Sequence, residues 1–291
     1  MFANTHFHSL FSDGALTPEQ LVDIAASVGH KALILTDHDT IRGSYFLEKA
    51  ARKKGILTML GCEFSTKDEG VSIHLVGVDF NPYEKNMAKL FERISTKQTI
   101  RSHILFDLAL SEGRMRPGIV WEDVERAFPY NDYLCNNQVF EVMVARGIYK
   151  REEYGEFFKE CFCVSSEINA EIKSKLPPDV STEEAVSIVI GAGGVPVVAH
   201  PSENPKYVTD PERLIAMGVM GFETRHPDMT KEECNFYAEL CTERGLYQLG
   251  GTDHSSVMSG LGDSMPQGRL PADCGYATEE NFMKLYRREL G

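Results

Sequence analysis

The sequence of 291 residues predicts an α/β protein in which helices alternate with short buried strands. Two observations support this fold class. Stretches with the apolar spacing of a helix alternate with short, continuous apolar runs that are typical of buried strands. Polar residues of the kind that bind metal ions follow most of these runs. Because the carboxyl ends of parallel strands share one face of a sheet or barrel, we expect these polar residues to gather there.

The first part of the chain has the rhythm of βα units. Residues 17–20 form a typical helix start, with a threonine as N-cap, a proline at the first helical position and a glutamine that completes a capping box. Apolar residues then follow helical spacing until Gly29 ends the helix. The elements expected next are a strand over 31–36, a helix over 44–54 that Gly55 ends, and strands over 56–60 and 72–78.

From residue 82 to residue 181 the strand pattern disappears, and we expect a helical insertion that covers the active-site face. The helices expected in it span 84–112, 121–128, 139–146 and 151–161. The βα rhythm then returns, with helices over 182–190 and 231–244 and strands over 195–199, 219–223 and 246–249. The catalytic domain is therefore expected to combine residues 1–81 with residues 182–291.

Composition restricts the class of protein. A net charge of −13 argues against a protein that holds duplex nucleic acid by broad phosphate neutralisation. The seven cysteines, an odd number without a CxxC pair, are typical of reduced thiols. The chain has no pattern of a signal peptide and no apolar run long enough to span a membrane. We therefore expect a cytoplasmic protein that binds neither membranes nor stable duplexes.

Nine residues with metal-binding side chains lie at or near the ends of the predicted strands: His6, His8, Asp13, His38, Glu63, His74, His200, Asp253 and His254. Imidazole and carboxylate ligands without cysteine favour zinc, iron or manganese. Each motif by itself has a simpler explanation, since a His-x-His pair is often incidental and Asp13-Gly14 could be a turn. Their common position in successive βα units predicts one multinuclear metal centre.

Taken in order, these motifs resemble those of the PHP (polymerase and histidinol phosphatase) family, and in particular its stand-alone phosphoesterases with a helical insertion. The resemblance covers most of the chain and rests on His6-x-His8 with Ser12-Asp13-Gly14, Thr36-Asp-His-Asp-Thr40, Gly61-Cys-Glu63, His74-Leu-Val-Gly77, Ala199-His-Pro201 and Gly250-Gly-Thr-Asp253. It implies a distorted seven-stranded (β/α) barrel of TIM-like type, with up to three metal ions at the carboxyl-end rim.

The resemblance also implies how the ligands divide among the ions. One ion would be held by His6, His8, Glu63 and Asp253. Glu63 would bridge it to a second ion held by His74 and His200. Asp13 and His38 would hold a third ion together with a histidine of the last motif. The family usually ends in Asp-x-His, whereas this chain has Asp253-His254-Ser255. Either His254 reaches the third ion from the adjacent position, or the chain works with two tightly bound ions.

Substrate contacts are expected from side chains around this centre. In nucleotide-directed members of the family, the insertion helix begins with Arg-x-His, whereas this chain has Asn136 and Gln138 there. The side chains that could bind phosphate are Arg42, Lys97, Arg101, Asn136, Arg225 and His226, although the cations could equally be solvated surface residues. The residues expected to support catalysis are His226 and His254, which could assist the leaving group, and Asp37, which could orient an imidazole or cap a helix.

The sequence thus predicts a metal-dependent phosphoesterase or phosphatase that hydrolyses a phosphomonoester of a small metabolite or nucleotide. Two to three divalent ions, either manganese, iron or zinc, would hold the hydroxide that attacks phosphorus. The alternatives are a 5′-to-3′ exonuclease on short RNA or DNA ends, an amidohydrolase that cleaves C–N bonds, and a non-catalytic metal-binding module. An amidohydrolase usually bridges its ions with a carboxylated lysine, and Glu63 fills that position here.

Overall fold

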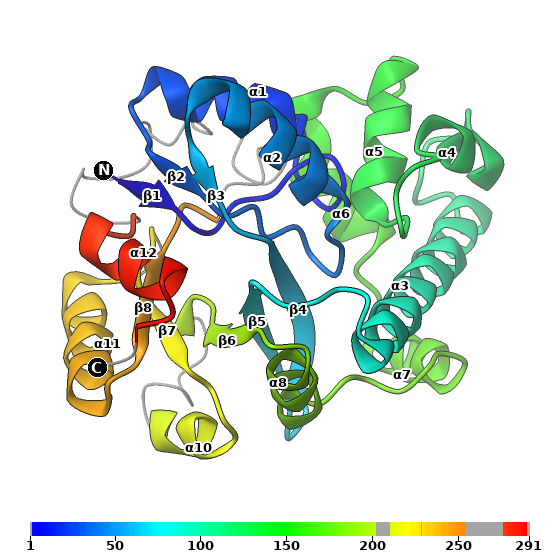
Figure 1. The fold of residues 1–291 in the computed structure, drawn as a ribbon. Coiled ribbons are helices and arrows are strands. Elements are labelled where there is room, and N and C mark those ends of the chain that lie inside the picture. The colour runs from blue at the N-terminus through cyan, green and yellow to red at the C-terminus, as the bar shows by residue number, and fades with distance from the viewer. Residues whose placement is uncertain (1, 202–209, 228, 254–275, 290–291) are drawn as a thin grey trace.

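The computed structural model describes residues 2–201, 210–227, 229–253 and 276–289. Its strands form two sheets (Figure 1). The first sheet is parallel, with the order β1 (Ala3–Asn4), β2 (Ala32–Leu33) and β3 (Leu57–Thr58). The second is mixed, with the order β4 (Gly61–Asp68), β5 (Val71–Val78), β6 (Val195–Val198), β7 (Gly221–Arg225) and β8 (Tyr247–Gly250).

The expected α/β class is confirmed, whereas the expected distorted seven-stranded (β/α) barrel is not confirmed, since the strands of the described residues form no closed barrel. Short backbone contacts join the two sheets. The amide of Asp39 donates to the carbonyl of Glu63 at 2.9 Å, and the amide of Thr5 donates to the carbonyl of Gly250 at 3.1 Å. These contacts bring the carboxyl ends of β1, β2 and β8 close to β4, where the metal-binding residues are concentrated.

The departure from a parallel barrel lies in the β4–β5 hairpin. The predicted strand over residues 72–78 exists as β5, but it runs antiparallel to β4, a strand that the sequence did not predict. Glu69 and Gly70 form the turn with positive φ angles of 47° and 82°, as tight hairpins require. Glu63 pairs with Val76, and Ser65 pairs with His74. Glu63 and His74 therefore lie on the same face, and His74 comes from within a strand.

The helices around the sheets follow the sequence closely. Helix α1 (Pro18–Ser27) begins with the expected capping box, and α2 (Arg42–Lys54) ends at Gly55, whose φ of 69° favours glycine. Helices α8 (Thr182–Gly191) and α11 (Lys231–Arg244) were also predicted. Helices α10 (Pro211–Ala216) and α12 (Glu279–Tyr286) were not predicted. In the described part of the chain, no helix is both long and apolar enough to cross a membrane.

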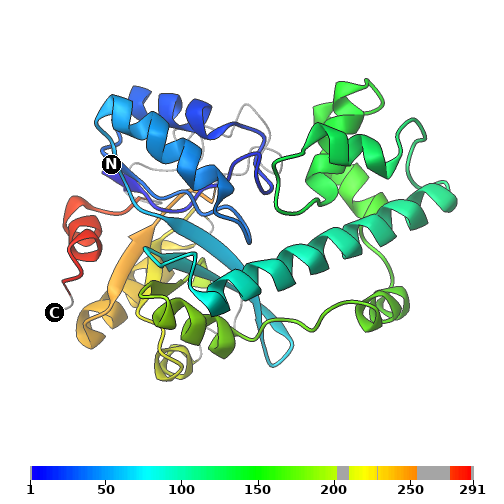
Figure 2. The same ribbon diagram turned by 45° about the vertical axis from the view of Figure 1, so that its right-hand side comes forward.

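The middle of the chain is helical, as expected. It contains α3 (Lys85–Ser111), α4 (Trp121–Ala127), α5 (Asn136–Ala145), a 3₁₀ turn η1 (Arg151–Glu153), α6 (Tyr154–Cys161) and α7 (Ser166–Ser174), of which only α7 was missed. Figure 2 shows α3 running from the mixed sheet to the other helices of this part.

Helix α3 connects two hydrophobic cores. Its first half contributes Met87, Leu90 and Ile94 to the core that also contains residues of the mixed sheet. Its second half contributes Leu105, Phe106 and Ala109 to a separate core of the helical part. The stretch from residue 97 to residue 101 belongs to neither core, so polar side chains there stand at the junction of the two parts.

Candidate metal centre

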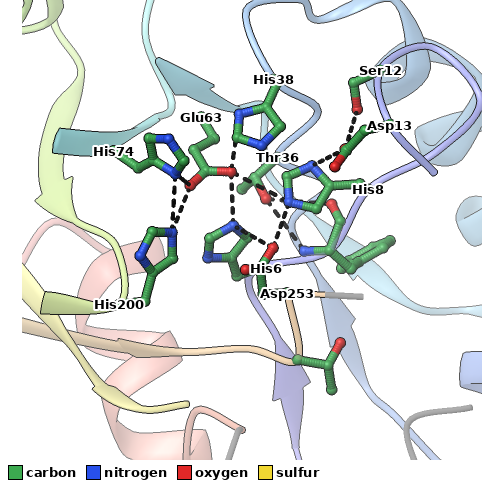
Figure 3. A network of polar contacts seen from close by, with 12 residues as sticks. His6, His8, Ser12, Asp13, Thr36, His38, Glu63, His74, His200 and Asp253 are labelled. Carbon is green, nitrogen blue, oxygen red and sulfur yellow. Dashed lines mark hydrogen bonds and ion pairs between the residues drawn. The ribbon is translucent and has the colours of Figure 1, made fainter. Parts of the chain in front are cut away.

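Glu63 lies at the centre of a cluster of imidazoles and is fully buried (Figure 3). Its Oε1 atom lies 2.9 Å from Nδ1 of His74 and 3.0 Å from Nε2 of His200. Its Oε2 atom lies 3.0 to 3.3 Å from one ring nitrogen in each of three further imidazoles, those of His6, His8 and His38. The two oxygens thus face two separate groups of ligands, as in a carboxylate that bridges two cations.

Two aspartates complete the cluster on the side of His8. The Oδ1 atom of Asp253 lies 2.8 Å from Nε2 of His8 and 3.5 Å from Nε2 of His6. The Oδ1 atom of Asp13 lies 3.4 Å from Nδ1 of His8. The structure therefore brings together eight of the nine predicted ligands, whereas His254 lies outside the described residues.

The donor atoms fit divalent metal ions. Four groups of three or four ligands have donor atoms within 4.8 Å of one another: His6, His8, Glu63 and Asp253; His8, Asp13 and His38; His38, Glu63 and His74; and His6, Glu223 and His226. In addition, Nδ1 of His8 and Nδ1 of His38 are buried without a hydrogen-bond partner among the described residues. Buried imidazole nitrogens of this kind suit coordination to zinc, iron or manganese.

Charge in the cluster favours the binding of cations. Burial alone lowers the pKa of His8, but Asp13, Asp253 and Glu63 together raise it to about 9. Burial alone raises the pKa of Glu63, but the surrounding imidazoles hold this pKa well below its usual value. The ionised carboxylates thus favour positive charge in the cluster, and metal ions compete with protons for the same ring nitrogens.

Glu223 supports the cluster from behind, and sequence analysis did not identify it. Its Oε1 atom lies 2.8 Å from Nδ1 of His6, and its Oε2 atom accepts a hydrogen bond of 2.6 Å from the backbone amide of His200. It is fully buried on β7. Such a carboxylate fixes the tautomer and the direction of a metal-binding imidazole. The available signal was a charged residue in an otherwise buried strand.

Asp37 accepts hydrogen bonds from the loop that carries Asp13. Its Oδ1 atom accepts hydrogen bonds of 2.6 Å from the amide of Ser9 and from Oγ of Ser12, and its Oδ2 atom accepts one of 2.7 Å from Oγ of Ser9. These bonds anchor the loop that carries Asp13 to Asp37. The predicted support of an imidazole by Asp37 stays a prediction.

The helical part holds the same loop from the other side. The side-chain amide of Asn137 donates to the backbone carbonyl of Asp13 at 2.9 Å. The side-chain amide of Gln138 donates to the backbone carbonyl of Ser12 at 2.5 Å. Asn136, the predicted phosphate ligand, donates instead to Tyr154 at 2.7 Å and to Asn137 at 2.5 Å. Its role in phosphate binding stays a prediction.

The other predicted substrate contacts lie around the centre in different settings. Arg42 forms an ion pair of 2.7 Å with Asp132, and Lys97 pairs with Asp179. Arg101 lines a cavity that His74 also lines. His226 is fully buried, and its ring centre lies 5.3 Å from that of His200. Arg225 is the last residue of β7. None of these placements tests a substrate contact.

The backbone at the strand ends is tightly constrained. His200 and Asp253 have positive φ angles of 27° and 46°, a conformation that side-chain-bearing residues rarely adopt and that is often found at functional sites. Gly251 lies against the backbone of His6, and any side chain at position 251 would collide with it. The motif Gly250-Gly-Thr-Asp253 therefore allows the last strand to bring Asp253 next to the first.

Residues 4–185 match the model of the PHP domain. The chain belongs to the PHP domain family. A 3′,5′-nucleoside bisphosphate phosphatase from Chromobacterium violaceum is 27% identical to this PHP protein over 92% of each chain. A 5′-3′ exoribonuclease from Haemophilus influenzae is 30% identical over 85% of this chain and 88% of its own length.

A solved structure from Bifidobacterium adolescentis, assigned as a metal-dependent phosphoesterase, superposes with a TM-score of 0.77 at 25% identity and covers 100% of this chain and 97% of that one. These similarities confirm the resemblance seen in the motifs and the expected enzyme class, a metal-dependent phosphoesterase.

Proposed function

We propose that this PHP protein hydrolyses a phosphomonoester of a nucleotide or another small metabolite at the cluster around Glu63. The observation that carries this proposal is the division of the Glu63 carboxylate between two groups of imidazoles, His74 with His200 and His6 with its neighbours. The similarity to a nucleoside bisphosphate phosphatase over nearly the whole chain supports the substrate class.

We assign two to three divalent ions to this cluster, with manganese, iron or zinc as the candidates. Bound ions of this type supply a nucleophile from water near neutral pH and stabilise negative charge on the phosphoryl oxygens. The chain's own residues hold the ligands in place: Glu223 orients His6, and Asp37 anchors the loop that carries Asp13. His226, with Nε2 3.7 Å from Oδ2 of Asp253, is placed to hold a proton at the edge of the cluster.

A 5′-to-3′ exonuclease that acts on short RNA ends is the second candidate, because the relative from Haemophilus influenzae has that activity in its name. The same centre would cleave the ester in both cases. The two candidates therefore differ in what surrounds the scissile phosphate and not in the chemistry of the metal ligands.

The test is hydrolysis of p-nitrophenyl phosphate by chelator-treated protein after addition of manganese, iron or zinc. We expect turnover with at least one metal and loss of turnover in Glu63→Ala. Glu48→Ala, an exposed glutamate of α2, is the matched control and should keep full activity. Metal content measured on the same samples links the loss to the site. If no metal produces turnover above that of Glu63→Ala, the proposed function is wrong.

A further inference from the structure

Asp13 lies in the loop between β1 and α1 and forms one group of possible ligands with His8 and His38. The first part of the loop follows the parallel sheet, since the amide of Thr36 donates to the carbonyl of Phe7 at 3.1 Å. The rings of His8 and His38 stack with their centres 4.6 Å apart. The Asp13 side chain, 25% exposed, stands at the edge of this pair with Oδ1 3.4 Å from Nδ1 of His8. Its position therefore depends on the contacts that hold the rest of the loop.

Three side-chain amides of the helical part donate to backbone carbonyls of this loop. Those of Asn137 and Gln138, at the start of α5, hold the carbonyls of Asp13 and Ser12 by bonds of 2.9 Å and 2.5 Å. The amide of Asn131 holds the loop three residues before Asp13, at 3.0 Å. The two bonds from α5 hold the peptide groups on either side of the Asp13 side chain, so they fix the direction in which that side chain points.

Neighbouring donors fix the orientation of both amides of α5. The backbone amide and Sγ of Cys135 each donate to Oε1 of Gln138 at 3.0 Å. The hydroxyl of Tyr154 donates to Oδ1 of Asn137 at 2.5 Å. Because each amide oxygen already accepts within the helical part, each amide nitrogen points towards the loop. Asn137 and Gln138 are only 3% and 2% exposed, so water competes little for these bonds.

The loop is thus held from two sides that pack separately. Asp37 holds it from the side of the parallel sheet, and α5 holds it from the side of the helical part. The end of the loop also packs on the helical part, since Ala15 contacts its separate hydrophobic core. A shift of the helical part relative to the sheets would therefore move Asp13 relative to His8.

We propose that Asn137 and Gln138 are positioning residues for the ion that Asp13 helps to bind, so that occupancy of this one ion site depends on the docking of the helical part. This inference rests on the proposed function, which assigns metal ions to the cluster. A metal ligand has to be held within about 0.5 Å of its working position, and loss of a residue that orients it lowers metal affinity by about 10- to 100-fold. The ions held by ligands from the strands and strand ends do not depend on α5.

The first experiment measures zinc binding to chelator-treated protein. Native mass spectrometry counts the ions on each chain, and competition with a fluorescent chelator gives their Kd values. Asp13→Ala identifies the ion that depends on Asp13. Gln138→Met, which removes the donor to the loop at nearly the same side-chain length, should raise the Kd of that ion by about tenfold. The combined variant with Asn137→Ala should raise it further, and the other ions should keep their Kd within about twofold.

A double-mutant cycle separates positioning from a general loss of stability. In the Asp13→Ala background, Gln138→Met should change no Kd further, because the ligand that Gln138 positions is already gone. Gln138→Glu is a second variant, which keeps the oxygen that Cys135 bonds and loses only the donor to the loop. It should also raise the Kd of the same ion, although its added negative charge by itself attracts cations.

Controls establish that the variants are folded. Asn86→Ala removes an exposed side-chain amide of α3 and should leave every Kd unchanged. Trp121, the one tryptophan of the chain, lies in the core of the helical part. Its fluorescence therefore reports whether that part still unfolds cooperatively in the metal-free variants.

The failures of the two proposals are distinguishable, because none of these measurements requires turnover. Unchanged Kd values in the Asn137 and Gln138 variants, or in Asp13→Ala, would overturn the inference. So would an equal loss of all ions in Gln138→Met, or additive effects of Gln138→Met and Asp13→Ala. An enzyme that binds its ions as expected but hydrolyses no p-nitrophenyl phosphate would overturn the proposed function and leave the positioning role in place.

Discussion

The metal centre and the cation pocket, a cavity of about 340 Å³ lined by cations of β4, α3 and α7, share His74 but are built in opposite ways. In the metal centre, Glu63 and His6 are fully buried and are held by strands whose backbones bond to one another. In the cation pocket, the side chains of Lys67 and Lys97 are 29% and 18% exposed, and their common partner is a single carboxylate. The first region fixes the position of each ligand atom, whereas the second presents charge on long, adaptable side chains.

We infer from this difference that rigid support matters most for the candidate metal ligands. A ligand atom that moves by a fraction of an ångström no longer binds its ion, so the metal ligands need buried, rigid support. Substitutions in the metal centre should therefore change turnover and metal content.

The largest effect is expected from Glu63→Gln. This change keeps the shape of the side chain but removes the charge that faces five imidazoles. We expect kcat/KM for p-nitrophenyl phosphate to fall by about a thousandfold, a loss of about 4 kcal/mol in transition-state stabilisation. Metal analysis by mass spectrometry should show fewer bound ions per chain. Retention of both full metal content and activity would contradict a bridging role for Glu63.

Glu223→Gln should have the next largest effect, a loss of metal affinity, because Glu223 holds the imidazole of His6 in place. Glutamine has one acceptor oxygen, so it cannot accept from both Nδ1 of His6 and the backbone amide of His200, and the imidazole is held less firmly. Loss of such a partner lowers metal affinity by about 10- to 100-fold. Competition with a fluorescent chelator measures that affinity directly. Glu232→Gln, on the exposed side of α11, is the matched control. Equal metal affinities in Glu223→Gln and Glu232→Gln would contradict the proposal that Glu223 positions His6.

Candidate ligands such as His6, His200 and Asp253 could be predicted from sequence because they follow strands whose ends meet, whereas Glu63 and His74 lie within the antiparallel strands β4 and β5. The signal for Glu223, a charged residue in an otherwise buried strand, did not reveal its role, because only the fold places this carboxylate behind His6. Sequence named Lys97 and Arg101 as possible phosphate contacts, but it did not show that Lys67 and Lys173, which are far apart in sequence, line the same cavity. The turn at Glu69 and Gly70 also escaped prediction, and with it the antiparallel path of β5.

His30 is a buried histidine without a neighbouring carboxylate among the described residues to raise its pKa, so it can be compared with the histidines of the metal centre. It is as buried as His8, but burial lowers its pKa to about 4. The unfolded chain binds a proton near pH 6.5 and the folded chain does not, so stability is complete above pH 6.5 and is lost as the pH falls towards 4. Between pH 7 and pH 5 the parent should lose about 2 kcal/mol more than His30→Gln.

Urea unfolding of chelator-treated protein at the two pH values measures this loss. The comparison is made between parent and variant because other groups also titrate in that range. Nuclear magnetic resonance of the His30 ring, followed through the same pH interval, gives its pKa directly. An identical change in stability for parent and His30→Gln would mean that burial does not depress the pKa of His30.

Arg42→Ala should have the smallest effect, because this cation is already paired. The guanidinium of Arg42 is half exposed and already bonds to Asp132, which also accepts from Oγ1 of Thr40. An exposed ion pair of this kind contributes about 0 to 1 kcal/mol, and a neutralised cation has little charge left for a phosphate. We therefore expect kcat/KM for both adenosine 5′-monophosphate and p-nitrophenyl phosphate to change by less than about threefold. A loss of about tenfold or more would contradict this expectation and favour the phosphate contact that the sequence predicted for Arg42.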